Sequence, residues 1–227
     1  MRHLEKATNM SKIKMWLPPE GVLEPNDDTH DPLRYYYRPF IGYMYRRRIE
    51  SGISLLQPPY RKILEIGYGS GIALPTLSRL GEAVWGLDSH SVPDRVARRL
   101  ETISVHPTLV NADICDWRHD GEPFDLVVAF SVMEHISEPA VALSQIALLL
   151  KAGGTLLIGI PRVDKIMSAM FPLIGYHCIE KHHVTTFHTV CKCAKPHFTL
   201  ERISTFPSWC PFWAGLYFNM LFVKRPT

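Results

Sequence analysis

A glycine-rich turn between an apolar run and an amphipathic run is the feature that most constrains how this chain can fold. It lies in "KILEIGYGSGIALPTLSRLG", residues 62–81, where Gly67, Gly69 and Gly71 follow the apolar run. Glycines let the backbone approach a ligand closely, and the start of a following helix presents unpaired N–H groups. The order strand, glycine turn, helix is therefore typical of a nucleotide site.

Apolar runs and amphipathic runs alternate on both sides of this turn. Strands are predicted over 61–67, 83–88, 108–113, 124–130 and 155–160, and helices over 72–80, 92–101 and 139–152. Two further strands with no helix between them, over 198–205 and 215–225, suggest an antiparallel pair that closes the sheet. We expect an α/β fold, a Rossmann-like sheet of seven mostly parallel strands with an antiparallel last strand and helices on both faces.

The spacing of the glycines separates the possible nucleotides. A dinucleotide fingerprint needs a glycine at position 72, which is isoleucine here, and no Gly-Lys-Ser/Thr follows to make a phosphate-binding P-loop. The match is instead E-x-G-x-G-x-G, from Glu65 to Gly71. Acids around such a turn repel a polyphosphate but attract a ligand that carries a cationic amino acid, so the pattern points to S-adenosylmethionine.

Two further acids stand where such a ligand needs them. Asp88 ends the second predicted strand, 21 positions after Gly67, where its carboxylate can accept hydrogen bonds from both ribose hydroxyls. Asp113 ends the third predicted strand, where it can meet an adenine amino group, although Asp116 lies one turn further on and competes for that role.

These residues resemble the class I S-adenosylmethionine-dependent methyltransferases, in particular the small-molecule branch that includes the ubiquinone-type enzymes. The resemblance runs from Arg61 to Arg162 through "LEIGYGSG", "GLD", "ADI", "FDLVVAFSVMEHI" and "LLKAGGTLLIGIP". It implies that the glycines line the methionine part of the cofactor, that Asp88 binds ribose and that Asp113 with Ile114 binds adenine. The cofactor-binding residues it implies are Glu65, Gly67, Tyr68, Gly69, Gly71, Asp88, Ser89, Asp113, Ile114, Phe130 and Ser131.

The chain is long enough, at 227 residues with 46% hydrophobic, for one domain with one sizeable core. We divide it into an N-terminal extension and helical cap (1–60), a cofactor-binding core (61–163) and a C-terminal part of the same domain (164–227). Prolines among polar residues predict irregular or partly disordered chain over 1–32. Apolar residues at helical spacing predict an amphipathic helix over 39–56.

Methyl transfer needs alignment first, and a base only when the acceptor keeps its proton. His135 follows the fourth predicted strand, at the sheet edge that carries ligands in parallel sheets, and is the candidate base. The alternative is a structural loop histidine. His183, in the "HHVTTF" segment before the last helix, is a possible acceptor contact by the same resemblance.

The sequence therefore predicts a methyltransferase that acts on oxygen or carbon of a small, hydrophobic or aromatic acceptor. The Asn/Asp-Pro-Pro-aromatic signature of amide and DNA methyltransferases is replaced by "FSVM", so DNA is not expected as a partner. An arginine cluster between Arg34 and Arg48 keeps an RNA methyltransferase open as an alternative. A non-catalytic protein that only binds the cofactor is the second alternative.

Cysteine and histidine positions argue against a metal site and an exported protein. Residues 175–197 hold five histidines and three cysteines, but no CxxC pair occurs and no metal is predicted. Five scattered cysteines are unlike a disulfide framework, and no signal peptide or spanning segment is recognised, so a cytoplasmic location is expected.

Aromatic side chains gather on both sides of the predicted core, over 35–45 and 209–218. Such stripes are usually part of a core, but this fold places its substrate lid there, and the first group also carries arginines. We therefore keep two expectations for the helix over 39–56: it covers the cofactor cleft, or it rests on a membrane surface.

Overall fold

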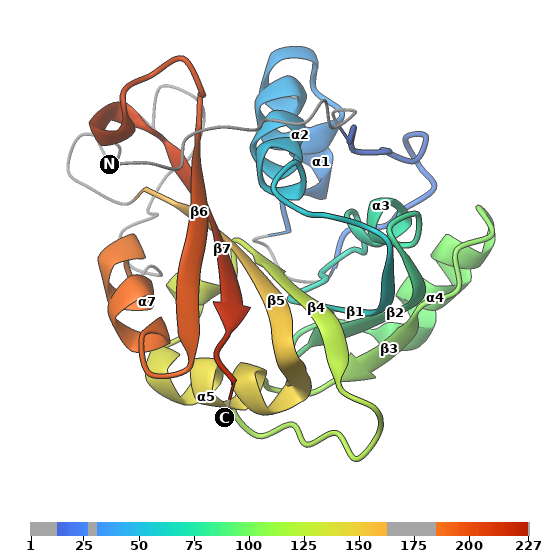
Figure 1. The fold of residues 1–227 in the computed structure, drawn as a ribbon. Coiled ribbons are helices and arrows are strands. Elements are labelled where there is room, and N and C mark those ends of the chain that lie inside the picture. The colour runs from blue at the N-terminus through green and yellow to red at the C-terminus, as the bar shows by residue number, and fades with distance from the viewer. Residues whose placement is uncertain (1–12, 27–30, 163–184, 227) are drawn as a thin grey trace.

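Seven strands form one sheet in the computed structural model, which describes residues 13–26, 31–162 and 185–226 (Figure 1). The order across the sheet is β3-β2-β1-β4-β5-β7-β6. β7 is antiparallel to both of its neighbours, and the other adjacent pairs are parallel, which confirms the predicted fold class. The strands are β1 (Tyr60–Ile66), β2 (Gly81–Asp88), β3 (Thr108–Asn111), β4 (Phe124–Phe130), β5 (Leu150–Pro161), β6 (Phe198–Phe206) and β7 (Tyr217–Lys224).

Helices cover both faces of this sheet. They are α1 (Leu33–Tyr36), α2 (Pro39–Ile53), α3 (Leu74–Leu77), α4 (Pro93–Glu101), α5 (Pro139–Leu149) and α7 (Phe187–Ala194). Successive strand residues point to opposite faces, so Val127 of β4 packs in the core under α5 and α7, and Val128 packs in the core under α1 to α4. Among the described helices, none is long and apolar enough to cross a bilayer.

The helix predicted over 72–80 is much shorter than expected. Only α3 is helical, and the chain leaves it through the bonds Arg79 N–H to Thr76 O and Leu80 N–H to Leu77 O, which are the tighter i to i−3 type. Pro75 lacks an N–H and favours the first turn of a helix over its interior. The third strand is also shorter than expected, because it ends at Asn111, two residues before Asp113.

The amphipathic helix predicted over 39–56 is present as α2 and packs on the β6–β7 edge of the sheet. Ser51 Oγ lies 2.9 Å from Ser204 Oγ of β6, and Asn219 Nδ2 of β7 donates to the backbone oxygen of Arg48 at 3.0 Å. A Cβ on Gly52 would lie 2.5 Å from Asn219 Oδ1, so glycine permits this close approach. α2 thus packs directly against the sheet.

Residues 13–26 are irregular, as predicted, but contacts to the helices hold them in place. The Met15 amide donates to Glu50 Oε1 at 3.1 Å, and the Trp16 amide donates to Thr76 Oγ1 at 3.0 Å. The guanidinium of Arg79 lies 4.2 Å from the centre of the Trp16 ring. This segment leads the chain to α1 along the side of the molecule that carries the carboxyl ends of β1 and β2 (Figure 1).

Candidate active site

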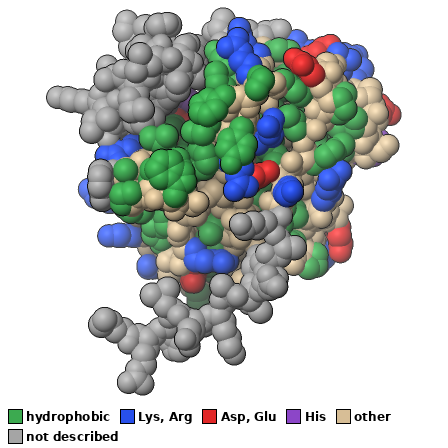
Figure 2. Space-filling model, turned by 90° about the horizontal axis from the view of Figure 1, so that it is seen from above, with side chains coloured by type: hydrophobic (Ala, Val, Ile, Leu, Met, Phe, Trp, Pro, Cys, Tyr) green, Lys and Arg blue, Asp and Glu red, His purple; other side chains and the backbone are tan. Residues whose placement is uncertain are grey.

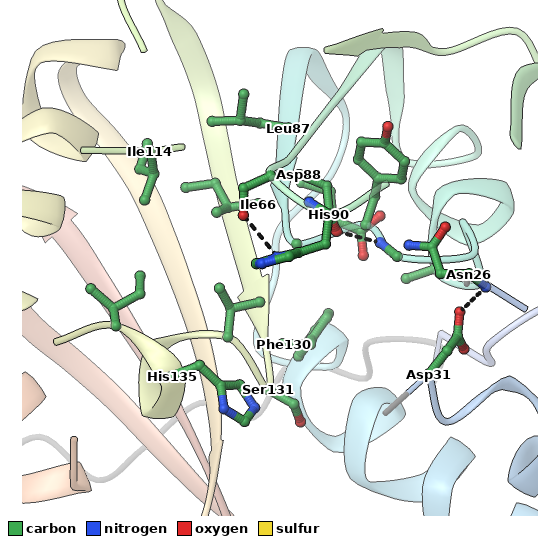
Figure 3. A pocket seen from close by; sticks show the side chains of 18 of the residues that line it. Asn26, Asp31, Ile66, Leu87, Asp88, His90, Ile114, Phe130, Ser131 and His135 are labelled. Carbon is green, nitrogen blue, oxygen red and sulfur yellow. Dashed lines mark hydrogen bonds between the residues drawn. The ribbon is translucent and has the colours of Figure 1, made fainter. Parts of the chain in front are cut away.

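A cavity of about 670 Å³ lies at the carboxyl ends of β1, β2 and β4 (Figure 3). This volume and this place are those of a ligand site in an open α/β sheet. Predicted site residues that line it are Glu65, Gly67, Tyr68, Gly69, Asp88, Ser89, Asp113, Ile114, Phe130, Ser131 and His135. Gly71 is not among the lining residues, and His183 lies outside the described residues.

The three glycines of the turn all have positive φ, yet each meets different surroundings. A Cβ on Gly67 would lie 2.2 Å from Val132 Cγ2, and one on Gly71 would lie 3.0 Å from Val96 Cγ1 of α4. A Cβ on Gly69 would meet nothing within 4 Å, because this residue faces the open cavity. Gly71 therefore serves packing against α4, and Gly69 is where backbone and ligand can approach each other.

Asp88 joins the end of β2 to the glycine turn. Its carboxylate accepts hydrogen bonds from the amides of Gly69 and His90, both at 2.8 Å. Ser91 Oγ donates to the backbone oxygen of Gly69 at 3.2 Å. Figure 3 shows Asp88 and His90 on the same wall of the cavity, so this carboxylate is held in place before any ligand binds.

Glu65 lies near the carboxyl end of β1, and its side chain is buried below this wall of the cavity. The pKa of its carboxyl is raised to about 8, first by burial and then by the nearby Asp88 charge. Within the described part of the chain, its Oε2 atom has no hydrogen-bond partner. A buried acceptor of this kind suits a ligand that brings an N–H donor.

Ser131 stands at the opposite side of the cavity, directly after β4. Its φ is 56°, which is uncommon for a residue with a side chain and is a feature that clusters at functional sites. Its amide donates to Gly159 O at 2.8 Å, and its Oγ lies 3.0 Å from the Tyr217 hydroxyl. Phe130 and His135 lie beside it in Figure 3.

Arg48 of α2 also lines the cavity, although nothing in the sequence identified it. Its guanidinium carbon lies 4.2 Å from the centre of the Tyr45 ring and 5.0 Å from that of Tyr217. Its Nε is buried and lacks a hydrogen-bond partner among the described residues. A buried guanidinium held by neutral rings suits an anionic ligand group.

Three more lining residues come from the chain before the core, namely Asn26, Asp31 and Tyr36. The Asn26 amide donates to Asp31 Oδ2 at 2.7 Å, and Asp31 Oδ1 accepts from the Leu33 amide at 2.8 Å at the start of α1. The Asp-Pro pair at 31–32 is a helix-start signal that was readable in the sequence. The sequence did not indicate that this pair lies over the cavity, because that position depends on tertiary packing.

Comparison with known proteins identifies the fold family. A family model described as a methyltransferase domain matches residues 37–193. The chain belongs to this methyltransferase family. The predicted class I S-adenosylmethionine-dependent methyltransferase is thereby confirmed, both as an enzyme and in its cofactor.

Curated relatives of this methyltransferase include ubiquinone biosynthesis O-methyltransferases. That of Pasteurella multocida is 25% identical over 232 residues, 97% of this chain and 88% of that protein. That of Maricaulis maris is 34% identical over 105 residues, which is 42% of this chain and only 39% of that protein. These matches support a methyltransferase of the small-molecule kind.

A solved structure shares the fold across nearly the whole domain. The N-methyltransferase NodS of Bradyrhizobium japonicum WM9, in complex with S-adenosyl-L-homocysteine, superposes with a TM-score of 0.64 at 20% identity. The match covers 87% of this chain and 94% of that one. At this identity the likeness bears on the methyltransferase fold alone.

Proposed function

We propose that this methyltransferase transfers the methyl group of S-adenosylmethionine to an oxygen, or alternatively a carbon, of a small hydrophobic or aromatic acceptor. The observation that carries the proposal is a single cavity with two unlike sides. The glycine turn and Asp88 line one side, and Ser131 and His135 line the other. The names of the curated relatives as O-methyltransferases favour oxygen.

The residues present fit the cofactor. The open face of Gly69 would take the methionine part, and Asp88 would accept hydrogen bonds from the ribose. The buried Glu65 Oε2 suits the ammonium group, and the buried Arg48 Nε suits the carboxylate of the same amino acid. Asp113 and Ile114, with Cys115 beside them, would enclose the adenine.

The cofactor supplies a sulfonium methyl group that a nucleophile attacks in line. His135 lies at the solvent-accessible edge of the cavity and would take the proton of an acceptor hydroxyl as the new oxygen–methyl bond forms. Ser131 and the Tyr217 hydroxyl behind it would orient that acceptor oxygen. Alignment of the two reactants would supply most of the rate enhancement.

The acceptor side favours a small hydrophobic molecule over RNA. Arg46 donates to Tyr36 O at 2.9 Å, Arg47 pairs with Glu50 at 2.9 Å, and Arg48 is enclosed by tyrosines. Three of the clustered arginines are thus engaged within the fold. Phe130, Ile136 and Tyr36 give this side an apolar lining, and contact of α2 with a membrane surface belongs to the same proposal.

Transfer of a labelled methyl group to a panel of phenols tests the proposal. The panel should increase in alkyl chain length, and mass spectrometry should report whether the product carries the methyl on oxygen or carbon. We expect O-methylated products with a lower KM for the longer chains. Turnover on RNA with none on any phenol would refute the acceptor class.

His135→Gln tests the role of the histidine in the same assay. We expect about a hundredfold lower kcat at neutral pH, since general base catalysis contributes on that order, with unchanged cofactor affinity in calorimetry. The loss should shrink at high pH, where a phenol ionises unaided. His106→Gln, on an exposed loop, is the matched control and should behave as the wild type.

A further inference from the structure

Two segments far apart in the sequence present exposed aromatic side chains. Phe40 and Tyr43 lie on the first turns of α2, and the Phe40 side chain is 72% exposed. Trp209 and Phe212 lie in the connection between β6 and β7, and Trp209 is 84% exposed. Among the described residues, the exposed large hydrophobic side chains that are aromatic all lie in these two segments.

Printed contacts bring these segments to one end of the molecule. Arg202 bonds to Leu55 O and Ser51 to Ser204, while Arg48 lies against Tyr217, so α2 runs antiparallel to β6. Tyr43 therefore lies ~12 Å beyond the Ser51 contact, at ~1.5 Å per helical residue. Trp209 extends at most ~16 Å beyond Ser204 in the same direction. Figure 1 shows both segments at the top of the molecule.

The same end carries positive charge with few acids. Arg34 and Arg38 are exposed on α1 and at its junction with α2, whereas the exposed Arg47 of α2 is paired with Glu50. Residues 32–49 contain no acid, and none follows Glu201. Figure 2, which looks down on this end, shows hydrophobic side chains next to lysine and arginine side chains. We call Arg34, Arg38, Phe40, Tyr43 and Trp209 the basic aromatic face.

This face borders the candidate active site. Tyr36 of α1 and Arg48 and Ile49 of α2 line the cavity, while Arg34 of α1 and Phe40 and Tyr43 of α2 belong to the face. The parallel strands also end in this direction (Figure 1). A molecule that leaves a surface contacted by this face therefore has a short path to the cavity.

We propose that the basic aromatic face docks this methyltransferase on a bilayer that contains anionic phospholipid. The inference rests on the proposed function, since a bilayer is where a hydrophobic acceptor would accumulate. Aromatic rings favour the boundary between headgroups and acyl chains, and exposed arginines favour anionic headgroups. The rings protrude from a helix start and a strand connection instead of lining a groove, which favours a lipid surface over a nucleic acid.

Sedimentation with vesicles tests the face directly. The full chain should bind vesicles of phosphatidylcholine with phosphatidylglycerol, bind pure phosphatidylcholine weakly, and lose affinity as salt rises. Arg34→Gln with Arg38→Gln should weaken binding roughly 25-fold, at about fivefold per arginine. Phe40→Ser with Trp209→Ser should weaken it at least tenfold.

The matched controls lie on α5 and α4, outside the basic aromatic face. Leu148→Ser removes an apolar side chain of α5 that is as exposed as Phe40, and Arg98→Gln removes an exposed arginine of α4. Both should bind vesicles as the wild type does. Equal loss in the controls and the face variants would overturn the proposal, as would no vesicle binding, dimer formation through the face, or a preference for RNA over vesicles.

Calorimetry separates this proposal from the proposed function. All face variants should bind S-adenosylmethionine with wild-type affinity and methylate a short, water-soluble phenol at the wild-type rate. Wild-type turnover without vesicle binding refutes the docking face alone. Vesicle binding without turnover on any phenol refutes the proposed acceptor class and leaves the face in place.

Discussion

The two sides of the cavity are built in different ways. The side that we propose for the cofactor consists of three short segments, 65–71, 88–90 and 113–115, each at or just beyond the carboxyl end of a parallel strand. The acceptor side brings together Tyr36, Arg48, Ser131 and His135 from α1, α2 and the chain after β4, with Tyr217 of β7 behind them. Neighbouring parallel strands bring the first set together, whereas packing of distant elements assembles the second.

The largest effect we expect is on the cofactor side. Gly69→Val places a side chain in the open cavity and forces a residue with a Cβ to adopt a φ of 51°. We expect cofactor affinity to fall more than a hundredfold in a protein that still folds, measured by calorimetry and circular dichroism.

Gly153→Val is the control for backbone strain. Gly153 has a φ of 70° and open space around its Cα, as Gly69 does, but lies near the start of β5, away from the cavity. This variant should lose stability and keep cofactor affinity. Equal affinities of the two variants for the cofactor would contradict the role given to Gly69.

The sequence alone was enough to predict that the residues of the proposed cofactor side lie together, because the information that places them is local. Glu65, the glycines and Asp88 lie within two strands and the turn between them, and strand alternation alone fixes their common edge. Predicting the sheet beyond β4 also required residues 198–225, where two strands without a helix between them indicated the antiparallel β6–β7 pair. The predicted length of the helix over 72–80 was wrong because tight turns replace helix after Leu77.

Arg48 shows why the acceptor side could not be predicted in the same detail. In the sequence it is one of three successive arginines, and helical periodicity places all three on a basic helix. The structure gives them different surroundings: Arg47 pairs with Glu50 at the surface, while Arg48 lies between Tyr45 and Tyr217. The difference depends on how α2 rotates against β7, and Asn219 and Gly52 determine that contact.

Arg48→Met is expected to have the second-largest effect, and it tests where the two sides meet. Loss of a charge-assisted bond to the cofactor carboxylate costs about 1.5 to 3 kcal/mol, or roughly tenfold to a hundredfold in affinity. Arg48→Lys should recover part of it, since an ammonium retains the charge without the planar fork. Calorimetry with S-adenosylmethionine measures both.

Arg47→Met is the matched control, because Arg47 is the neighbouring arginine in the sequence and its side chain lies at the surface. It should leave cofactor affinity unchanged. A further comparison uses decarboxylated S-adenosylmethionine, which lacks the carboxylate. The wild type should bind this analogue about as weakly as Arg48→Met binds the natural cofactor. If the wild type bound the analogue and S-adenosylmethionine with equal affinity, Arg48 would belong to the acceptor side only.

The smallest effect we expect is on the pH dependence of stability, and it compares two buried acids: Glu65, which lines the cavity, and Glu134, which precedes His135 and does not line it. The pKa values of Glu65 and Glu134 are both raised to about 8, mainly by burial. The Asp88 charge contributes to the rise at Glu65, and the Arg48 charge opposes the rise at Glu134. An unfolded chain releases these protons near pH ~4.5. Between that pH and about 8 the unfolded state therefore binds fewer protons than the folded state, so stability falls as pH rises.

Glutamine cannot ionise, so Glu65→Gln and Glu134→Gln should each flatten this fall. Melting without cofactor should show the variants close to the wild type near pH 5 and gaining on it by a few degrees toward pH 8, since ~1 kcal/mol shifts Tm by ~2 to 4 °C in a domain of this size. Adding Arg48→Met to Glu65→Gln should make stability fall more steeply with pH again, because Glu134 remains and the Arg48 charge acts on it. Adding Arg48→Met to Glu134→Gln should change the fall little, because only Glu65 remains. Parallel melting curves for all of these proteins would mean that neither carboxyl keeps its proton in the folded state, and the interior of the protein would then hold two more negative charges than we infer.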